Sequence, residues 1–431
     1  MRLHIIASAV LFGIGAATLA VSAEGEDTNS REATFRQLEL FGDVLSRIEA
    51  DYVTEPDKAE LIESAIDGMM QALDPHSSYL SPDDFQDMQV TTSGEYGGGG
   101  IVCISPIAET PGERAGLEPN DQIIAVDGES MIGASMDDAV ERMRGLAGDP
   151  VVLTILREGE EDPFDVTVVR DLIEVRAAYW RMEEGDTPYL RITTFNENTT
   201  ANAIAGLNDL TEAYGGPLPG LILDLRSNPG GLLDQSVTVS SLFLDGGEVV
   251  STRGRDPRDT RRYNAELGDM LNGAPIVVLI NSGSASASEI VTGALQDRER
   301  ATIVGMTSFG KGSMQTVVPL RGGRDGALRL TTARYYTPAG RTIQATGIAP
   351  DIAIAPRRVE QEEVEGVNTY AEASLRNALE NETGAEREEL ENELSHTEMP
   401  PEDWEAGEDY QLYRAIEILN AMMSRDQAQL Q

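Results

Sequence analysis

The chain has 431 residues, enough for two or three domains of about 150 residues each, and its 40% apolar content makes a large buried core feasible. Its formal net charge of −41 argues against nucleic acid or anionic lipid as a partner, because both are bound through basic patches. Cys103 is the only cysteine, so an internal disulfide and a Cys-rich metal site are excluded, and we expect no cofactor or metal.

The first segment is typical of a secretory signal. A short basic start precedes an uncharged, mostly apolar run from Ile5 to Val21, and small residues follow as far as Ala23. We therefore predict that residues 1–23 are a signal peptide, cut after Ala23, and that the protein is periplasmic or otherwise exported. The alternative is a retained membrane anchor, which the run is slightly too short to form, since a span needs about 20 residues.

Residues 24–87 are predicted to form a helical N-terminal region. Apolar residues recur at helical spacing in two stripes, from Phe35 to Ile48 and from Leu61 to Leu73. A stretch rich in turn residues then ends the helical pattern, and for His76 within it we expect a local hydrogen-bonding role.

Residues 88–171 read as a region of short strands and turns. The glycine-rich run from Gly94 to Ile101 permits close backbone approaches, but it does not fit a nucleotide-binding fingerprint, because no strand precedes it and no helix follows. Strands with period-two character are predicted at Val151–Arg157 and Asp165–Val169.

From residue 172 to residue 356 strands and helices alternate, which predicts a layered α/β domain. The expected strands are Tyr189–Phe195, Gly220–Leu225, Glu248–Thr252, Pro275–Asn281, Ala301–Gly305 and Leu328–Tyr336, and the expected helices are Thr200–Tyr214, Leu232–Leu242 and Ala285–Gln296. Residues 357–431 hold six Arg against twenty Asp and Glu, so we expect a solvated acidic extension. Within it, Asp409–Met423 is predicted to be a helix that could bind a partner.

Three loops of the α/β domain stand out as places for chemistry. Asp224–Gly231 follows an apolar strand, and its Pro-Gly-Gly leaves bare N–H groups that can face an anion. Asn281–Ile290 opens a helix with four serines in seven positions, where a hydroxyl would have N–H groups beside it to stabilise an oxyanion. Ordinary helix capping is the alternative explanation for these serines.

The third loop, Ser308–Gln315, contains one of only two lysines in a chain with 31 arginines. Arg cannot lose its proton in a protein, whereas a buried Lys can become a neutral base, so Lys311 is a candidate base. A clamp for a phosphate or carboxylate is the alternative. Gln315 lies on the same face in a strand or one turn away in a helix, and in either case it could hold the amine.

These loops, in this order, resemble those of the C-terminal processing peptidases, or tail-specific proteases. The resemblance spans nearly the whole mature chain and includes Leu73–Pro82, Ala115–Gly128 and Leu330–Pro338. It implies a ClpP/crotonase-like layered α/β protease core at residues 172–356, with an inserted PDZ domain at residues 88–171. It also implies Ser286 as nucleophile, Lys311 as general base and Gln315 as the residue that orients the base.

The resemblance further implies an oxyanion hole from the backbone N–H groups of Gly231 and Ala287. The implied PDZ peptide site consists of Tyr96, Gly97, Gly98, Gly99, Gly100 and Ile101. It would capture apolar C-terminal tails of protein substrates by strand addition. About ten residues that relatives carry between the glycine-rich run and Ser105 are missing here, so we expect a shortened PDZ domain.

The predicted function is an exported serine endopeptidase that cleaves protein substrates through a Ser/Lys dyad and an acyl-enzyme. The C-terminal helix is predicted to mediate a homo-oligomer or adaptor contact, and a membrane would be contacted only through an uncleaved signal segment. One alternative is a catalytically silent peptide-binding scaffold. A crotonase-like acyl-CoA enzyme is another, although such an enzyme would need basic groups for the phosphates of its substrate.

Overall fold

The computed structural model of the chain describes residues 21–93, 95–98, 101–102, 105–106, 111–117, 121–131, 142–143, 145–157, 163–174, 176–358, 371–387, 390–404 and 408–429. Residues 1–20 of the expected signal peptide lie outside this set, as do Gly99 and Gly100 of the expected PDZ peptide site. The chain separates into two compact units, Met1–Met69 and Met70–Gln431.

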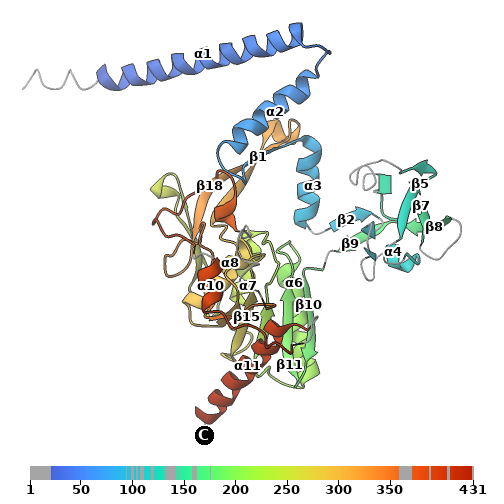
Figure 1. The fold of residues 1–431 in the computed structure, drawn as a ribbon, viewed down its shortest axis with the longest axis vertical. Coiled ribbons are helices and arrows are strands. Elements are labelled where there is room, and N and C mark those ends of the chain that lie inside the picture. The colour runs from blue at the N-terminus through green and yellow to red at the C-terminus, as the bar shows by residue number, and fades with distance from the viewer. Residues whose placement is uncertain are drawn as a thin grey trace, which may run out of the picture. The chain divides into compact units, whose positions relative to one another are not determined.

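The first unit is helical, as the two apolar stripes predict. It contains α1 (Val21–Asp51) and most of α2 (Lys58–Gln71), which Figure 1 shows in blue. Within the described part of the chain, no helix is both long enough and apolar enough to cross a bilayer.

The second unit begins with β1 (Ser78–Leu80) and α3 (Pro82–Ser93) and then enters a small region of short strands. The elements of this region are β2 (Glu95–Gly98), β3 (Ile101–Val102), β4 (Ser105–Pro106), α4 (Pro111–Arg114), β5 (Gln122–Val126), β6 (Glu129–Ser130), β7 (Pro150–Leu156), β8 (Phe164–Val169) and β9 (Asp171–Glu174). Strands β6, β5, β7 and β8 form one antiparallel sheet, in which the alternate residues Val151, Leu153 and Ile155 of β7 are buried.

A six-stranded sheet forms the centre of the α/β core, in the order β10-β11-β12-β15-β16-β19. Its strands are β10 (Ala178–Glu183), β11 (Thr187–Ile192), β12 (Leu221–Asp224), β15 (Ile276–Ile280), β16 (Thr302–Gly305) and β19 (Ile352–Ala353). All neighbours from β11 onwards are parallel, and β10 joins β11 as an antiparallel hairpin. The predicted α/β alternation is therefore a real parallel sheet.

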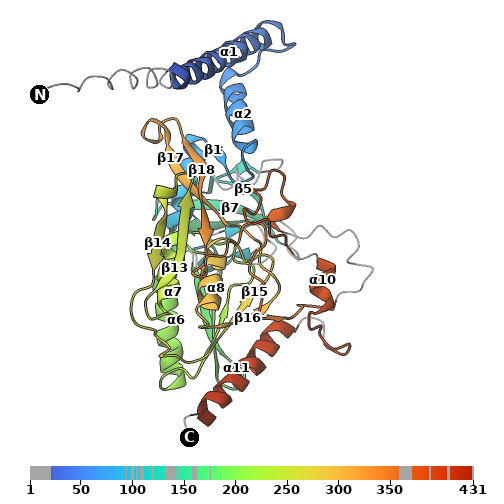
Figure 2. The ribbon, with the colours of Figure 1, turned by 90° about the vertical axis from the view of Figure 1, so that its left-hand side faces the viewer.

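Both faces of this sheet are buried, because its strands are apolar at nearly every position. Along β15, Ile276 and Val278 pack with α6 (Thr199–Tyr214), α7 (Leu233–Ser241) and α8 (Ala287–Asp297) on one face. Val277 and Leu279 face the other way and pack against α11 (Tyr410–Gln429), which Figure 2 shows beside β15 and β16. The C-terminal helix thus covers its own sheet with its apolar face.

A second sheet lies in the order β1-β18-β13-β14, and β17 also pairs with β18. It contains β13 (Glu248–Gly254), β14 (Arg261–Asn264), β17 (Ser313–Pro319) and β18 (Ala327–Tyr336), with the short turns η1 (Pro257–Asp259) and η2 (Leu320–Gly323) between them. In the C-terminal extension, η3 (Glu372–Ser374) and α10 (Leu390–Ser395) precede α11. Because β1 pairs with β18, Ser78 and Arg329 meet at this sheet although they lie far apart in the sequence.

Candidate active site

The three candidate loops leave the same edge of the parallel sheet. Strands β12, β15 and β16 are consecutive neighbours, and each runs directly into one of the loops at its carboxyl end. The carboxyl ends of parallel strands lie at one edge, where α/β proteins bind their ligands. The fold therefore brings together segments that are about 60 and 25 residues apart in the sequence.

Ser286 occupies the turn between β15 and α8 in a strained conformation. Its φ of 55° and ψ of −110° lie in a region that non-glycine residues rarely adopt, and only 8% of the residue is exposed. The neighbouring serines have structural partners, since Ser284 Oγ donates to Leu225 O at 2.8 Å and Ser288 Oγ donates to Asn228 O at 2.9 Å. These two hydroxyls fix the serine loop (Asn281–Ile290) to the glycine loop (Asp224–Gly231).

The backbone of the glycine loop packs closely against Ser286. A side chain at Gly230 would come within 2.9 Å of Ser286 Cβ, and one at Gly231 would come within 2.2 Å of Phe195 O. Gly231 also has a φ of 145°, which other residues rarely adopt. Ala287 is the first residue of α8, so its N–H lacks a partner within the helix. In the described part of the chain neither the Gly231 nor the Ala287 N–H donates a hydrogen bond.

One buried carboxylate holds the serine loop and the lysine loop (residues 306–312, between β16 and β17) together. Glu289 Oε2 accepts the backbone N–H of Ser286 at 2.7 Å and that of Lys311 at 2.9 Å. Its other oxygen accepts Ser308 Oγ and the Gly310 N–H, each at 2.6 Å. Burial raises the pKa of Glu289 to about 7, against the opposing effect of these four donors.

Lys311 lies in the loop between β16 and β17. Burial lowers the pKa of its amine from the usual value, and the positive charge of Arg329 lowers it further. Glu372, Glu289 and Asp74 act in the opposite direction. The other lysine, Lys58, is exposed and ion-paired to Glu49 at 2.6 Å, so the two amines sit in contrasting environments.

Gln315 lies in a strand, which decides between the two conformations considered from the sequence. A bulge in β17 separates it from Met314. Its amide nitrogen donates to Ser313 Oγ and Thr331 Oγ1, each at 3.1 Å. Thr331 in turn donates to Asp74 at 3.0 Å, so Gln315 is connected to the N-terminal segment through β18.

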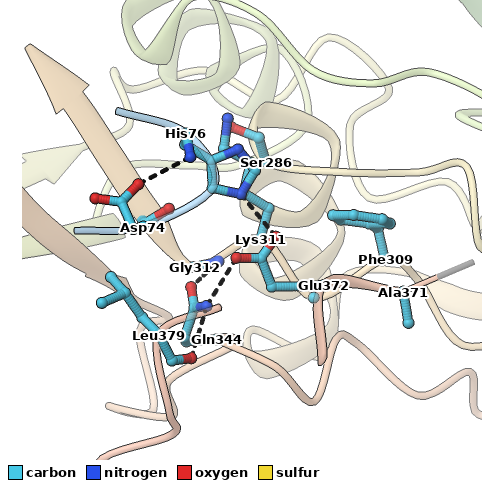
Figure 3. Close-up of polar contacts among 12 residues, drawn as sticks. Asp74, His76, Ser286, Phe309, Lys311, Gly312, Gln344, Ala371, Glu372 and Leu379 are labelled. Atoms are coloured by element: carbon cyan, nitrogen blue, oxygen red, sulfur yellow. Dashed lines mark hydrogen bonds and ion pairs between the residues drawn. The ribbon is translucent and has the colours of Figure 1, made fainter. Parts of the chain in front are cut away.

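Two segments outside the three loops also reach the site, and sequence reasoning assigned neither of them a role there. Asp74 and His76 come from the turn before β1, and Glu372 comes from η3 in the acidic extension; all three lie near Lys311 in Figure 3. Arg387 donates to the carbonyls of Thr307, Ser308 and Phe309 in the lysine loop. The turn motif around His76 was visible in the sequence, but nothing in it indicated the distant partners.

A cleft of about 490 Å³ lies at the end of β13, beside the residues that pair with β18. Its lining includes Thr331, whose hydroxyl contacts Gln315 and Asp74, so the cleft adjoins the lysine side of the site. The residues that line it are Arg253, Gly254, Arg255, Pro257, Thr260, Thr331, Thr332, Ala333, Arg334, Tyr336, Leu379 and Glu382. This cleft is basic although the chain as a whole is strongly acidic.

The residues expected to capture a peptide tail lie partly within β2. Tyr96 pairs with Ile173 and Gly97 pairs with Leu172, so this strand joins the beginning of the small region to its end. Ile101 begins β3. The tail-binding role of these residues stays a prediction.

Comparison with known proteins matches three parts of the chain to described families. Peptidase family S41 matches residues 186–354, a PDZ domain matches residues 104–157, and the N-terminal domain of the activating protease CtpB matches residues 14–83. A carboxy-terminal-processing protease of Bartonella bacilliformis is 50% identical over 348 residues, covering 78% of this chain and 80% of that protein. One from Synechocystis is 38% identical over 305 residues, covering 67% and 70%.

Among solved structures, a photosystem II D1 C-terminal processing protease is 28% identical, covers 77% of this chain and 98% of its own, and superposes with a TM-score of 0.44. The chain is a serine-type peptidase with a PDZ domain. It belongs to the carboxy-terminal-processing peptidases of family S41. The family resemblance and the α/β fold class predicted from the sequence are thereby confirmed.

Proposed function

We propose that this protein is an exported endopeptidase in which Ser286 is the nucleophile and Lys311 is the general base. The observation that carries the proposal is the shared Glu289 oxygen, which holds the backbones of both residues in one buried cluster. A lysine with a lowered pKa can be neutral near neutral pH, and a neutral amine can accept the proton of a serine hydroxyl.

The reaction follows from these roles. The Lys311 amine takes the proton of the Ser286 hydroxyl as Oγ attacks the carbonyl carbon of the substrate. The peptide C–N bond then breaks, the Lys311 ammonium gives its proton to the departing amine, and an acyl-enzyme remains. In the second half, the same amine takes a proton from water as the water oxygen attacks the ester carbonyl. The bond between the acyl carbon and Ser286 Oγ then breaks, and the Lys311 ammonium returns the proton to Oγ.

The oxyanion of each tetrahedral intermediate would be bound by the N–H groups of Gly231 and Ala287. Support comes from the lack of any hydrogen bond from these two groups within the described residues, and from the contact between Gly230 and Ser286. Such donors are worth about 3–4 kcal/mol each in comparable enzymes. Gln315 would orient Lys311 through the backbone of β17, because its amide nitrogen is already bonded to Ser313 and Thr331.

Substrates would be proteins or peptides with apolar C-terminal tails, bound by the PDZ domain at Tyr96–Ile101. The polypeptide would then pass the basic cleft at Thr331 on its way to Ser286. Export through a signal peptide cut after Ala23 belongs to the same proposal, and an uncleaved segment would leave the protein anchored in a membrane.

A homo-oligomer or adaptor contact through the C-terminal helix would have to use its outer surface, since the inner surface packs on the core sheet. Tyr413 is 45% exposed there and is the most suitable anchor. A Tyr413→Ala protein with unchanged mass in light scattering would count against such a contact.

The catalytic assignment is tested by digestion of an unfolded protein such as casein across pH. We expect Ser286→Ala and Lys311→Met to lower kcat/KM by at least about 10³-fold. Lys311→Arg should be equally inactive, because arginine stays protonated. Lys58→Met, which removes the exposed lysine, is the matched control and should retain full activity. Undiminished digestion by Ser286→Ala would instead favour a peptide-binding scaffold.

A further inference from the structure

A second buried carboxylate lies beside Lys311, and the reaction above does not use it. Glu372 is completely inaccessible to solvent, although it belongs to the acidic C-terminal extension. Its backbone N–H donates to Phe309 O at 3.0 Å, and Gln344 Nε2 donates to its Oε1 at 3.0 Å. Gln344 also accepts the N–H of Gly312 at 3.0 Å, so the Glu372 network holds the chain on both sides of Lys311.

The remaining oxygen of Glu372 contacts a histidine from the opposite end of the chain. His76 Nε2 lies 2.7 Å from Glu372 Oε2, a contact that Figure 3 shows between the two segments. The backbone of His76 is fixed by Asp74, which accepts its N–H at 2.9 Å, and by Arg329, which donates to its carbonyl at 3.1 Å. The expected local hydrogen bond therefore involves the His76 backbone, while the ring reaches a residue 296 positions away.

We propose that His76 is a positioning residue for the Ser286–Lys311 pair. Its imidazole holds the buried Glu372 carboxylate beside the Lys311 amine and offsets the negative charge of that carboxylate. This inference rests on the proposed role of Lys311 as the base. Without the imidazole, the Glu372 carboxylate would keep one side-chain donor, Gln344, and its uncompensated negative charge would hold the proton on Lys311 more tightly.

The other charged groups around His76 cannot take over its role of offsetting the negative charge of Glu372. Asp74 is bonded to the backbone of the same turn, and Arg329 contacts the His76 carbonyl. Glu289 is committed to four donors of the serine and lysine loops. Among the negative charges that raise the pKa of Lys311, Glu372 has the largest effect, and His76 is the ionisable group that contacts it directly.

Because the chain has only two lysines, the protonation of Lys311 can be measured directly. We would label the lysines with ¹³C at Cε in the Ser286→Ala protein, which cannot digest itself, and titrate the two NMR signals with pH. Lys58→Arg assigns them, and the exposed Lys58 is an internal reference in every sample. We expect His76→Ala to raise the pKa of Lys311 by about one unit and Glu372→Gln to lower it by about one unit.

A double variant at His76 and Glu372 tests whether His76 acts by offsetting the charge of Glu372 or only by packing. If His76 acts through Glu372, His76→Ala combined with Glu372→Gln should give the same Lys311 pKa as Glu372→Gln alone. His76→Gln, which keeps a donor but no charge, should give a smaller rise than His76→Ala and keeps the test available if the alanine variant folds poorly. An unchanged Lys311 pKa in folded His76→Ala and His76→Gln would overturn the inference.

The pH dependence of digestion, measured with Ser286 restored, gives the second readout. The acidic limb of kcat/KM should move to higher pH in His76→Ala and to lower pH in Glu372→Gln. A uniform loss at all pH values would show only a structural role and would count against compensation. If instead Lys311→Met retained activity, the catalytic assignment itself would be wrong, and this outcome is independent of the His76 variants.

Discussion

The core loops and the two outlying segments contribute different kinds of residue to the same site. The loops after β12 and β15 contribute glycines, serines and backbone N–H groups, which need a close and strained backbone around Ser286. The turn before β1 and the acidic extension contribute ionisable groups around Lys311: Asp74 and Glu372, which are buried, and His76 and Arg387, which are partly buried. In the proposed mechanism the core therefore supplies the reacting groups, and the outlying segments set the environment of the base.

This difference predicts which substitutions should lower activity most. A change in the core should act on the reaction itself, because it alters groups that contact the substrate. A change in an outlying segment should act through the position or charge of Lys311, and should therefore be smaller and accompanied by a loss of stability. The three substitutions below test this order from the largest expected effect to the smallest.

Gly231→Ala should produce the largest loss. The added methyl group would lie 2.2 Å from Phe195 O, and the φ of 145° is unfavourable for alanine, so the N–H at this position must shift. Displacing one oxyanion donor lowers kcat by about 10²–10³-fold in comparable enzymes, and we expect that range here. Steady-state kinetics on a peptide substrate would measure it.

Gly216→Ala is the matched control, because a side chain there meets no atom within 4 Å and its φ is not positive. It should leave kcat unchanged. A folded Gly231→Ala enzyme with the kcat of the wild type would contradict the oxyanion assignment and the special role of the core loops.

The sequence predicted the core better than the outlying segments, and the reason is physical. Apolar runs such as 276–280 fix a buried strand locally, and the rarity of lysine drew attention to Lys311. Hydrogen-bond partners nearly 300 residues apart leave no periodic signal. The acidic extension was expected to be solvated because its charge is high, yet Glu372 and Glu393 are both buried against the Lys311 loop.

The C-terminal helix is a second case in which the sequence did not reveal a distant partner. The sequence predicts here a helix that could bind a partner, and in the structure this helix packs on the chain's own sheet, where Ala415 and Leu419 are buried. A pattern in one segment shows that an apolar face will be covered, but it does not say by what. The conformation of Gln315 was undecided for a related reason, since four residues of spacing fit both a strand and a helix.

Arg387→Met should have an intermediate effect. The guanidinium donates to three consecutive carbonyls, Thr307, Ser308 and Phe309, immediately before Lys311. Removing the guanidinium leaves the Thr307 and Ser308 carbonyls without these donors, while Phe309 O still accepts the Glu372 N–H. We expect this to cost about 1–3 kcal/mol of stability, and a looser loop should lower kcat about tenfold. Thermal unfolding and peptide kinetics would measure the two effects.

Arg376→Met, an exposed arginine of the same extension, is the matched control and should change neither quantity. If Arg387→Met were folded and as inactive as Lys311→Met, the outlying segment would take part in the reaction itself, and the division between the two regions would fail.

Asp74→Asn should have the smallest effect, and its pH dependence tests whether the outlying charge stabilises the fold. Burial raises the pKa of Asp74, but hydrogen bonds from Ser77, His76 and Thr331 outweigh it, so the pKa is lowered from 3.8. A carboxylate with a lowered pKa stabilises the folded state above its unfolded pKa and loses this contribution as pH falls through the folded value.

We therefore expect Asp74→Asn to lower the free energy of unfolding by about 1 kcal/mol at neutral pH, with the difference from the wild type shrinking below about pH 3.8. Urea unfolding at a series of pH values would measure this, with the exposed Asp43→Asn as the control that should show no difference. A constant difference at all pH values would mean that Asp74 acts by its shape and hydrogen bonds alone. The ionic contribution of the outlying segments would then come from Arg387 and from Glu372 with its contact to His76.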